Sequence, residues 1–377
     1  MKRTLAVLLA AATVLQSSGR TSWGAAVATG FGASPNIAAG SLDAGHPSSI
    51  RKFLLSYWEP GDFHRIVAAA QAAGLGKLGG VSFGSYGISG EDSGLLHGAN
   101  PRFSYSPAFT LKRNTLWDRR RLSRDEEKLL PGKDLPLAGR IPSQERLLAM
   151  GSTERHSWGI ELGQRFRDHI RAVRRTGVTI ETWQFDELLG EASGPSGRPI
   201  RELTAAILFG LAFGRPALGD KPRKGILWLA QTSMRLVYRP LDPELSRFWG
   251  AVNASTRFIA GEEYPVFTGD PAAAARRGSA YQARLLRSGG VRAELGRKYL
   301  VGLSPGYIPI ERGLGGKTSG MSGAQVRHWR QAYVRARACE HAAGFAMYNF
   351  RHENRGKGII REAVEDIGIG VRTARCR

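Results

Sequence analysis

Short apolar runs alternate along this chain with longer segments whose apolar residues recur at helical spacing, and no other feature constrains the fold as much. The short runs are predicted to be strands, at residues 53–58, 78–83, 178–185, 225–231, 257–261, 299–303 and 344–350. The longer segments are predicted to be helices, at residues 62–73, 158–175, 200–213, 243–254, 271–287 and 324–343. A regular strand–helix alternation predicts a parallel sheet covered by helices, which is the α/β class.

The preferred architecture is a (β/α)8 TIM-type barrel with a long insertion after the second strand. A closed barrel of this kind needs an eighth strand beyond the predicted ones, and we expect it within residues 85–155, near 41–45 or at 369–373. The alternative is a doubly wound open parallel sheet. Its G-x-G-x-x-G fingerprint occurs at Gly74–Gly79, but there it follows a helix and enters a strand, which is the reverse of the required order.

The N-terminal residues have the three parts of a secretory signal peptide. Lys2 and Arg3 are positively charged, residues 5–15 form an apolar run, and Ala26 and Ala28 fit the small-x-small cleavage pattern. The run is shorter than the ~20 residues of a membrane-spanning helix. The sequence therefore predicts a secreted or extracytoplasmic protein, in the periplasm or at the cell surface. Its predicted parts are a signal peptide (1–28), a flexible segment (29–49) and a single barrel domain (50–377) with an insert at 85–155.

The chain is strongly basic, with 54 Lys and Arg against 32 Asp and Glu and a formal net charge of +22. Such a field favours an anionic partner, such as an acidic polysaccharide, a wall polymer, a phospholipid surface or nucleic acid, although the same charge also serves solubility. The two cysteines are Cys339 and Cys376, and export would allow a disulfide between them. No H-E-x-x-H motif is present, and we expect no metal and no cofactor.

Polar and aromatic residues gather at the carboxyl ends of the predicted strands, which is where parallel α/β folds bind their ligands. The strand bodies are apolar, whereas their ends gain carboxylates, amides and aromatic rings. The candidate substrate-binding residues at these ends are Trp58, Glu59, Tyr86, Trp183, Gln231, Tyr264, Asn349, Arg351 and His352. For each aromatic residue taken alone, packing in the core is the competing interpretation.

Two of these strand ends carry candidate catalytic carboxylates, Asp186 and Glu187 on one and Glu262 and Glu263 on the other. Glycoside hydrolysis needs two carboxyl groups, one to protonate the leaving oxygen and one to attack the sugar or activate water. Alternation along the strand directs Asp186 into the barrel mouth and leaves Glu187 at the rim. We predict Glu187 as the general acid, its pKa raised by an apolar wall, and Glu262 as the nucleophile or base, while Asp186 orients substrate hydroxyls. The alternative for each acid is a helix cap or an ion pair with Arg.

The export signal, the strand–helix rhythm and the strand ends at 183–187 and 261–264 resemble the secreted (β/α)-barrel glycoside hydrolases over residues 50–370. The likeness is architectural. No family within the group is assigned, because no Asn precedes Glu187 and the two acidic ends are two predicted strands apart rather than three. The resemblance implies a carbohydrate-active hydrolase that cleaves a glycan or a cell-wall polymer. The alternative is a barrel without catalysis that binds anionic or glycan polymers at the cell surface.

Overall fold

The structure is a computed structural model. It describes residues 50–56, 63–85, 88, 90–110, 144–188, 190–230, 232–263, 265, 269–303, 321–348 and 359–376. The predicted signal peptide (1–28) and the predicted flexible segment (29–49) lie outside the described residues. No helix among the described residues is long and apolar enough to cross a membrane.

In the part of the chain that the structure describes, eight parallel strands form a closed barrel in chain order. The last strand pairs with the first, with Lys52 opposite Gly344 and Ser56 opposite Tyr348. This closure confirms the predicted barrel and excludes the open sheet. The strands are β1 (Lys52–Ser56), β2 (Gly80–Ser85), β3 (Phe103–Thr110), β4 (Gln184–Leu188), β5 (Gly225–Leu229), β6 (Thr256–Glu262), β7 (Tyr299–Leu303) and β8 (Gly344–Tyr348).

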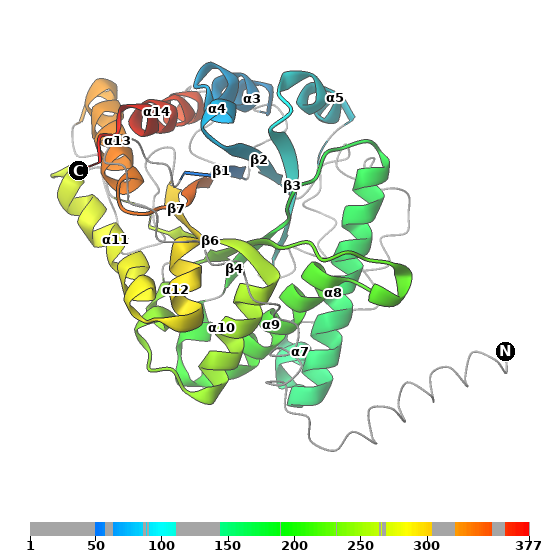
Figure 1. Cartoon of the computed structure of the whole chain (residues 1–377). Coiled ribbons are helices and arrows are strands. Elements are labelled where there is room, and N and C mark those ends of the chain that lie inside the picture. Colours follow the sequence, from blue (N-terminus) through cyan, green and yellow to red (C-terminus); the bar gives the residue numbers. More distant parts are fainter. Residues whose placement is uncertain are drawn as a thin grey trace. The chain divides into compact units, whose positions relative to one another are not determined.

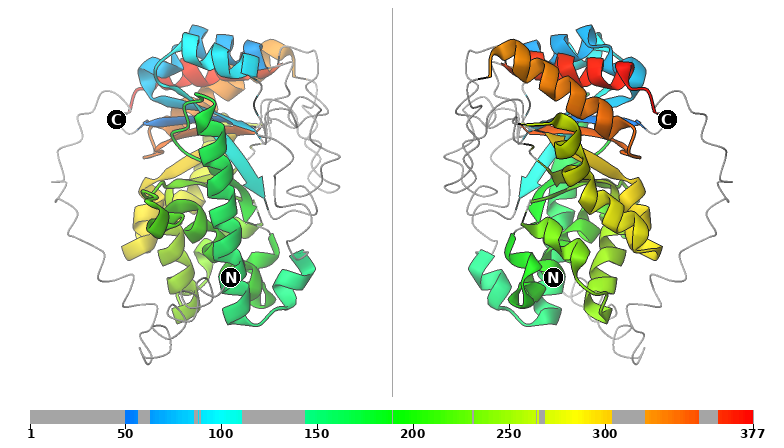
Figure 2. Two further views of the ribbon diagram at one scale, coloured as in Figure 1. Left: turned by 90° about the vertical axis from the view of Figure 1, so that its right-hand side faces the viewer. Right: turned by 90° about the vertical axis from the view of Figure 1, so that its left-hand side faces the viewer.

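Helices surround the barrel on its outer face, as Figures 1 and 2 show. Helices α8 and α9 pack closely: a Cβ on Gly163 would lie 2.2 Å from the carbonyl oxygen of Ile207, and a Cβ on Gly210 would lie 2.2 Å from that of Ile160. Only glycine permits this approach. The described helices are α3 (Phe63–Ala72), α4 (Leu75–Leu78), α5 (Gly90–Ala99), α7 (Gln144–Ala149), α8 (Ser152–Arg175), α9 (Arg198–Phe213), α10 (Pro243–Ser255), α11 (Pro271–Arg287), α12 (Gly290–Arg297), α13 (Gly323–Ala338) and α14 (Ile359–Thr373).

The eighth strand is β3, which lies within residues 85–155, one of the three places where we expected it. An apolar run does not mark this strand in the sequence, because its inward-facing positions include serines. Ser104 and Ser106 point into the barrel and are buried there. The hydroxyl groups of Ser82 and Ser104 are hydrogen-bonded across neighbouring strands at 2.8 Å. Residues 369–373, another of the three places, belong to helix α14.

Side chains fill the barrel interior. An inner cluster of buried apolar residues is separate from the larger core between strands and helices, and it consists of Leu54, Ile226, Trp228, Phe258, Ala260, Leu300, Ala343 and Ala346. At the amino-terminal end of the barrel, the Glu181 carboxylate pairs with Lys52 at 2.7 Å and with Arg257 at 2.5 Å. The interior thus holds an apolar cluster, and an ion-pair network lies at its amino-terminal end. Ligands of such barrels bind at the other, carboxyl-terminal end.

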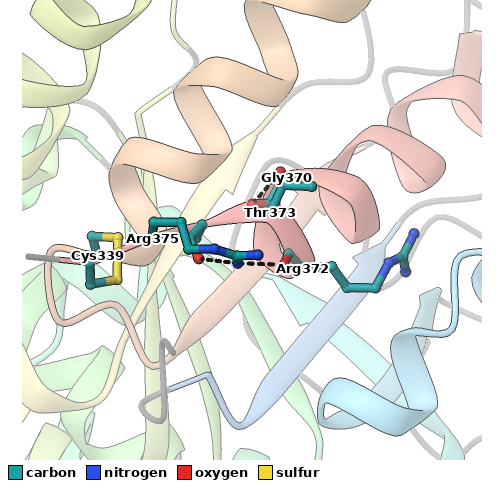
Figure 3. Close-up of a disulfide and its surroundings, with 7 residues drawn as sticks. Cys339, Gly370, Arg372, Thr373 and Arg375 are labelled. Carbon is teal, nitrogen blue, oxygen red and sulfur yellow. Dashed lines mark hydrogen bonds between the residues drawn. A yellow bond between two sulfur atoms is a disulfide. The ribbon is translucent and has the colours of Figure 1, made fainter. Parts of the chain in front are cut away.

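Cys339 and Cys376 form a disulfide, with their Cα atoms 5.1 Å apart. Figure 3 shows it beside the last turn of α14, where Thr373 donates a hydrogen bond to the Gly370 carbonyl oxygen. The bond joins the end of α13 to the residues after α14, and so closes a loop that contains β8.

Replacing Cys376 with Ser is expected to lower the free energy of unfolding by about 3–4 kcal/mol, because the unfolded chain regains the entropy of a loop whose ends are 37 residues apart. Denaturant unfolding with and without a reductant measures the effect. The Cys339→Ser variant should give the same loss, and the reductant should have no effect on either variant. An unfolding midpoint of the unaltered protein that is insensitive to reduction would contradict this expectation.

Candidate active site

The floor of the site is the side chain of Gln184, at the start of β4 and fully buried. Its Oε1 accepts hydrogen bonds from Ser56 Oγ at 2.9 Å and from the indole Nε1 of Trp228 at 2.8 Å, and its Nε2 donates to the carbonyl oxygen of Ser106 at 3.3 Å. A Cβ on Gly84 would lie 1.9 Å from Gln184 Nε2, so the glycine leaves the space that this amide occupies. Four strands therefore hold one amide group across the barrel interior.

Asp186 lies above this floor on β4. It follows Gln184 by two residues, and alternation along a strand places it on the same, inward face. Its side chain is 2% exposed. The pairing of β4 with β5 shifts register between Phe185 and Leu188, which is a β-bulge or a similar irregularity at Asp186 and Glu187. Irregularities of this kind are frequent beside active sites, where they redirect a side chain.

Glu187 occupies the second position of the irregularity, in the backbone of β4. Its side chain lies outside the part of the chain that the structure describes. Phe185 and Leu188, on either side of the two acids, are both buried in the outer core against the helices. Because two residues rather than one separate these outward-facing side chains, the simple alternation used in the sequence prediction does not hold between them.

Glu262 is the last residue of β6 and lies on the inward face. It follows Phe258 and Ala260 at intervals of two residues, and both belong to the inner cluster. Its side chain is 5% exposed. Asp186 and Glu262 therefore lie on the same side of the barrel wall, at the carboxyl ends of strands separated only by β5.

Glu263 points the opposite way, into the layer between the barrel and the helices. Its carboxylate accepts hydrogen bonds from Arg337 Nη2 at 2.6 Å, from Arg337 Nε at 3.1 Å and from the hydroxyl group of Tyr333. A Cβ on Gly278 of α11 would lie 2.3 Å from Glu263 Oε2, so the helix has a glycine where the carboxylate approaches it. The structure thus separates two acids that the sequence analysis had grouped together.

The Glu263–Arg337 pair is deeply buried, with side-chain exposures of 1% for the acid and 0% for the base. Burial lowers the pKa of the Arg337 guanidinium, but the charge of Glu263 and its hydrogen bond, together with Tyr333 and Tyr299, raise it overall. Burial and then the charge of Glu263 raise the pKa of Tyr333 and that of Tyr299 well above their usual range. Both tyrosines therefore stay neutral and keep their hydroxyl protons over the physiological range of pH.

Trp183 lies at the far end of β4 from the acids. Its indole Nε1 donates to the carbonyl oxygen of Arg223 at 2.8 Å, just before β5, and its ring fills the space where a Cβ on Gly225 would stand. The side chain is 1% exposed. The structure places this tryptophan as a packing element at the amino-terminal end of the barrel, and it is not in contact with the mouth.

The other candidate substrate-binding residues lie outside the described residues, so their side chains stay sequence-based predictions. They are Trp58, Glu59, Tyr86, Gln231, Tyr264, Asn349, Arg351 and His352.

The sequence analysis missed an aromatic pair in the barrel. The rings of Trp228 on β5 and Tyr348 on β8 meet edge to face, with their centroids 5.9 Å apart. Trp228 is fully buried, whereas Tyr348 at the carboxyl end of its strand is partly exposed. The available signal was the period of two along β5, which places Trp228 on the same face as Ile226.

Among the described residues, no group of three His, Cys, Asp or Glu side chains is arranged to hold a metal ion. The described residues at and below the mouth include the carboxyl groups of Asp186 and Glu262, the amide of Gln184, the hydroxyl group of Ser56 and the ring of Tyr348. This set can transfer protons, attack an electrophilic carbon and stack on a sugar ring.

No protein-family model matches the chain, and no curated protein matches it. The solved structures that are similar to it include the following two. One is the spore cortex-lytic enzyme SleL of Bacillus megaterium QM B1551, at 9% identity and a TM-score of 0.43, with 87% of this chain and 75% of that chain covered. The other is from a study of two fungal β-1,4-galactanases, at 11% identity and a TM-score of 0.41, with 86% of this chain and 87% of that chain covered. Likeness at this level says nothing of the activity of this chain, and the barrel itself rests on the strand pairing.

Proposed function

We propose that this protein is a carbohydrate-active hydrolase that cleaves a glycan or a cell-wall polymer with two carboxyl groups, one from β4 and one from β6. The observation that carries the proposal is the inward, buried position of Asp186 and Glu262 at the carboxyl ends of these strands. Burying a charged carboxyl group costs free energy unless the group is paired or hydrogen-bonded. Ligands of parallel α/β barrels bind at the carboxyl ends of the strands, which is where these two acids lie.

The spacing of the strands suits this chemistry. Neighbouring strands lie about 4.8 Å apart, so β4 and β6 are about 10 Å apart along the barrel wall. Side chains that converge on the barrel axis bring their ends closer together than their backbones. The carboxyl groups would then fall near the ~5–5.5 Å that retaining glycosidases need or the ~6.5–9.5 Å that inverting ones need.

The proposed reaction divides the work between the two strands. An acid on β4, assigned to Glu187, donates its proton to the glycosidic oxygen as the bond from that oxygen to the anomeric carbon breaks. Glu262 either attacks the anomeric carbon or removes a proton from the water that does so. Asp186 orients the substrate hydroxyls, and the partly exposed ring of Tyr348 is suited to stack against a sugar.

Replacing the β4 acids one at a time tests the proposal. Glu187→Gln should lower kcat by about 10²–10⁴-fold, the usual contribution of a general acid, while Asp186→Asn should act mainly through KM. Initial rates on the glycan that the protein hydrolyses give both numbers, and circular dichroism checks the fold. If Asp186→Asn shows the loss in kcat and Glu187→Gln does not, the two roles are exchanged. If both variants keep the full rate, the two-carboxylate mechanism fails.

We also propose that the protein works outside the cytoplasm, on the basis of the sequence pattern from Lys2 to Ala28. Intact-mass spectrometry of the protein recovered from the extracytoplasmic fraction should show a new N-terminus near Thr29. Full-length protein confined to the cytoplasm would refute export, and it would leave the proposed chemistry of the barrel untouched.

A further inference from the structure

The amino-terminal end of the barrel, opposite the candidate active site, carries a concentration of positive charge. Arg51 precedes β1, Lys224 precedes β5, Arg257 is the second residue of β6, and Arg297 and Lys298 precede β7. We call these five residues the amino-end cluster. Strands β5, β6 and β7 are consecutive neighbours in the barrel. The first residue of β5, Gly225, pairs with Thr256 of β6, and the first residue of β7, Tyr299, pairs with Ile259 of β6.

Contacts between the strands show that these cations come close together. The guanidinium groups of Arg51 and Arg257 both lie over the ring of Phe258, with their central carbon atoms 6.0 Å and 5.8 Å from its centroid. Arg51 Nη2 also donates to the carbonyl oxygen of Arg297 at 3.3 Å. The ring of Phe258 thus brings together Arg51, which precedes β1, and Arg257 of β6. The hydrogen bond from Arg51 to the backbone of Arg297 brings a third basic residue close to them.

The negative charge that faces the cluster is small. Glu181 pairs with Arg257, but the same carboxylate also pairs with Lys52. Lys298 Nζ donates to Asn253 Oδ1, a neutral acceptor, at 2.6 Å. Burial, and then repulsion from Lys224 and Arg51, lower the pKa of Lys298 to about 8 against the attraction of Glu294. Cations held together in this way repel one another, and a bound anion would relieve the repulsion.

The helix dipole does not account for the arrangement. Lys and Arg are favoured in the last turn of a helix, where they offset the partial negative charge, and this explains Arg297 at the end of α12. Lys224, however, comes eleven residues after the last residue of α9, Phe213, and Arg257 lies inside a strand. Arg51, Lys224, Arg257 and Arg297 are all exposed to solvent.

We propose that the amino-end cluster is a binding site for an acidic polysaccharide, held through its carboxylate groups at the end of the barrel remote from the catalytic mouth. The choice of a glycan as the polyanion rests on the proposed function.

The surface itself disfavours the other polyanions, phospholipid and nucleic acid. The exposed large apolar residues in the described part of the chain are Leu218, Tyr238 and Leu241, and only Leu218 lies in a connection at this end. One leucine is a poor anchor for a bilayer, and no exposed aromatic ring in the cluster offers nucleic-acid bases a surface for stacking.

A triple variant tests the site in the full-length mature protein. Arg51→Gln, Lys224→Gln and Arg297→Gln together remove three exposed charges and leave the ion pairs of Glu181 intact. The matched control is Arg65→Gln, Arg276→Gln and Arg277→Gln, which removes the same charge from exposed positions in the first halves of α3 and α11. Thermal unfolding of both variants checks that they fold.

The probe is polygalacturonate, and its dissociation constant is measured at several salt concentrations. The unaltered protein and the control should bind it with a similar affinity that falls as salt rises, because screening weakens charge contacts. The amino-end triple variant should bind at least tenfold more weakly at low salt, with a shallower salt dependence. Equal weakening in the two variants would mean that net charge alone attracts the polymer, and it would overturn the site.

Anionic phospholipid vesicles and a single-stranded oligonucleotide serve as competing probes. If either binds the unaltered protein more tightly than polygalacturonate does, and loses that affinity in the amino-end variant, the glycan is the wrong occupant. Because binding is measured without hydrolysis, these results do not depend on the chemistry of the mouth. Conversely, loss of hydrolysis in Glu262→Gln with polygalacturonate binding unchanged would support both proposals independently.

Discussion

The Glu262→Gln variant is expected to lose about 10²–10⁴-fold or more of the rate of glycan hydrolysis while its stability stays close to that of the unaltered protein. The amide keeps the size of the side chain but can neither attack an anomeric carbon nor accept a proton from water. Glu262 is 5% exposed at the inner face of β6. Initial rates and thermal unfolding of the same preparation measure the two quantities.

Glu263→Gln is the matched control, because it makes the same chemical change one residue along the chain. Glu263 faces the helices, where its charge balances Arg337 in a pair with side-chain exposures of 1% and 0%. The amide would leave the buried guanidinium with only the partly exposed Glu340 as its counter-charge, and we expect a loss of stability of about 3–5 kcal/mol. Where the variant is still folded, its rate should be reduced much less than that of Glu262→Gln. The reverse pattern, with Glu263→Gln inactive and Glu262→Gln active, would contradict the division of roles.

The second large effect is expected from Arg337→Met, which should destabilise the protein by about 3–5 kcal/mol because it leaves the Glu263 carboxylate buried without its cation. The arginine also donates to Gln282 and Glu340, so it joins β6 to α11 and to the end of α13. Denaturant unfolding gives the change in free energy. Arg335→Met, two residues earlier on the same helix, is the control and should change stability by about 0.5 kcal/mol at most.

A double variant separates the ion pair from simple packing. Glu263→Leu combined with Arg337→Met removes both charges, so no uncompensated ion stays buried. Apolar replacement of a buried pair is often neutral or stabilising. The double variant should therefore be more stable than a variant in which only Glu263 or only Arg337 is replaced, because each of those keeps one uncompensated charge. If the two single losses instead add up in the double variant, the interaction between the charges is not what holds this region together.

The sequence predicted the architecture because the barrel strands are mostly apolar and the helices have clear ends. Strand β7 and helix α11 match their predicted bounds residue for residue. The helix begins at Pro271, and the side chain of Asp270 caps it by accepting from the backbone N–H groups of Ala272 and Ala273 at 3.0 Å. An Asp-Pro pair before an apolar periodic run is a strong start signal. Strand β3 lacked such a pattern because its inward-facing positions are serines.

The candidate site was harder to predict, because the direction of each side chain depends on where a strand begins and on irregularities in its pairing, and the sequence reveals neither. Glu262 and Glu263 look equivalent in sequence, yet the period of two that places Phe258 in the inner cluster sends them to opposite faces. Along β4 the irregularity between Phe185 and Leu188 interrupts that period. Trp183 looked like part of the site because the predicted strand ran from residue 178, whereas β4 begins at Gln184.

The central claim is that the barrel mouth hydrolyses a glycan, and the most direct test is the release of new reducing ends from a panel of purified wall polymers and polysaccharides. The mature protein should release reducing ends from at least one polymer, and the Glu262→Gln variant from the same preparation should release almost none. Binding to a polymer without any release by the mature protein would contradict the account and would leave a non-catalytic, polymer-binding barrel in its place.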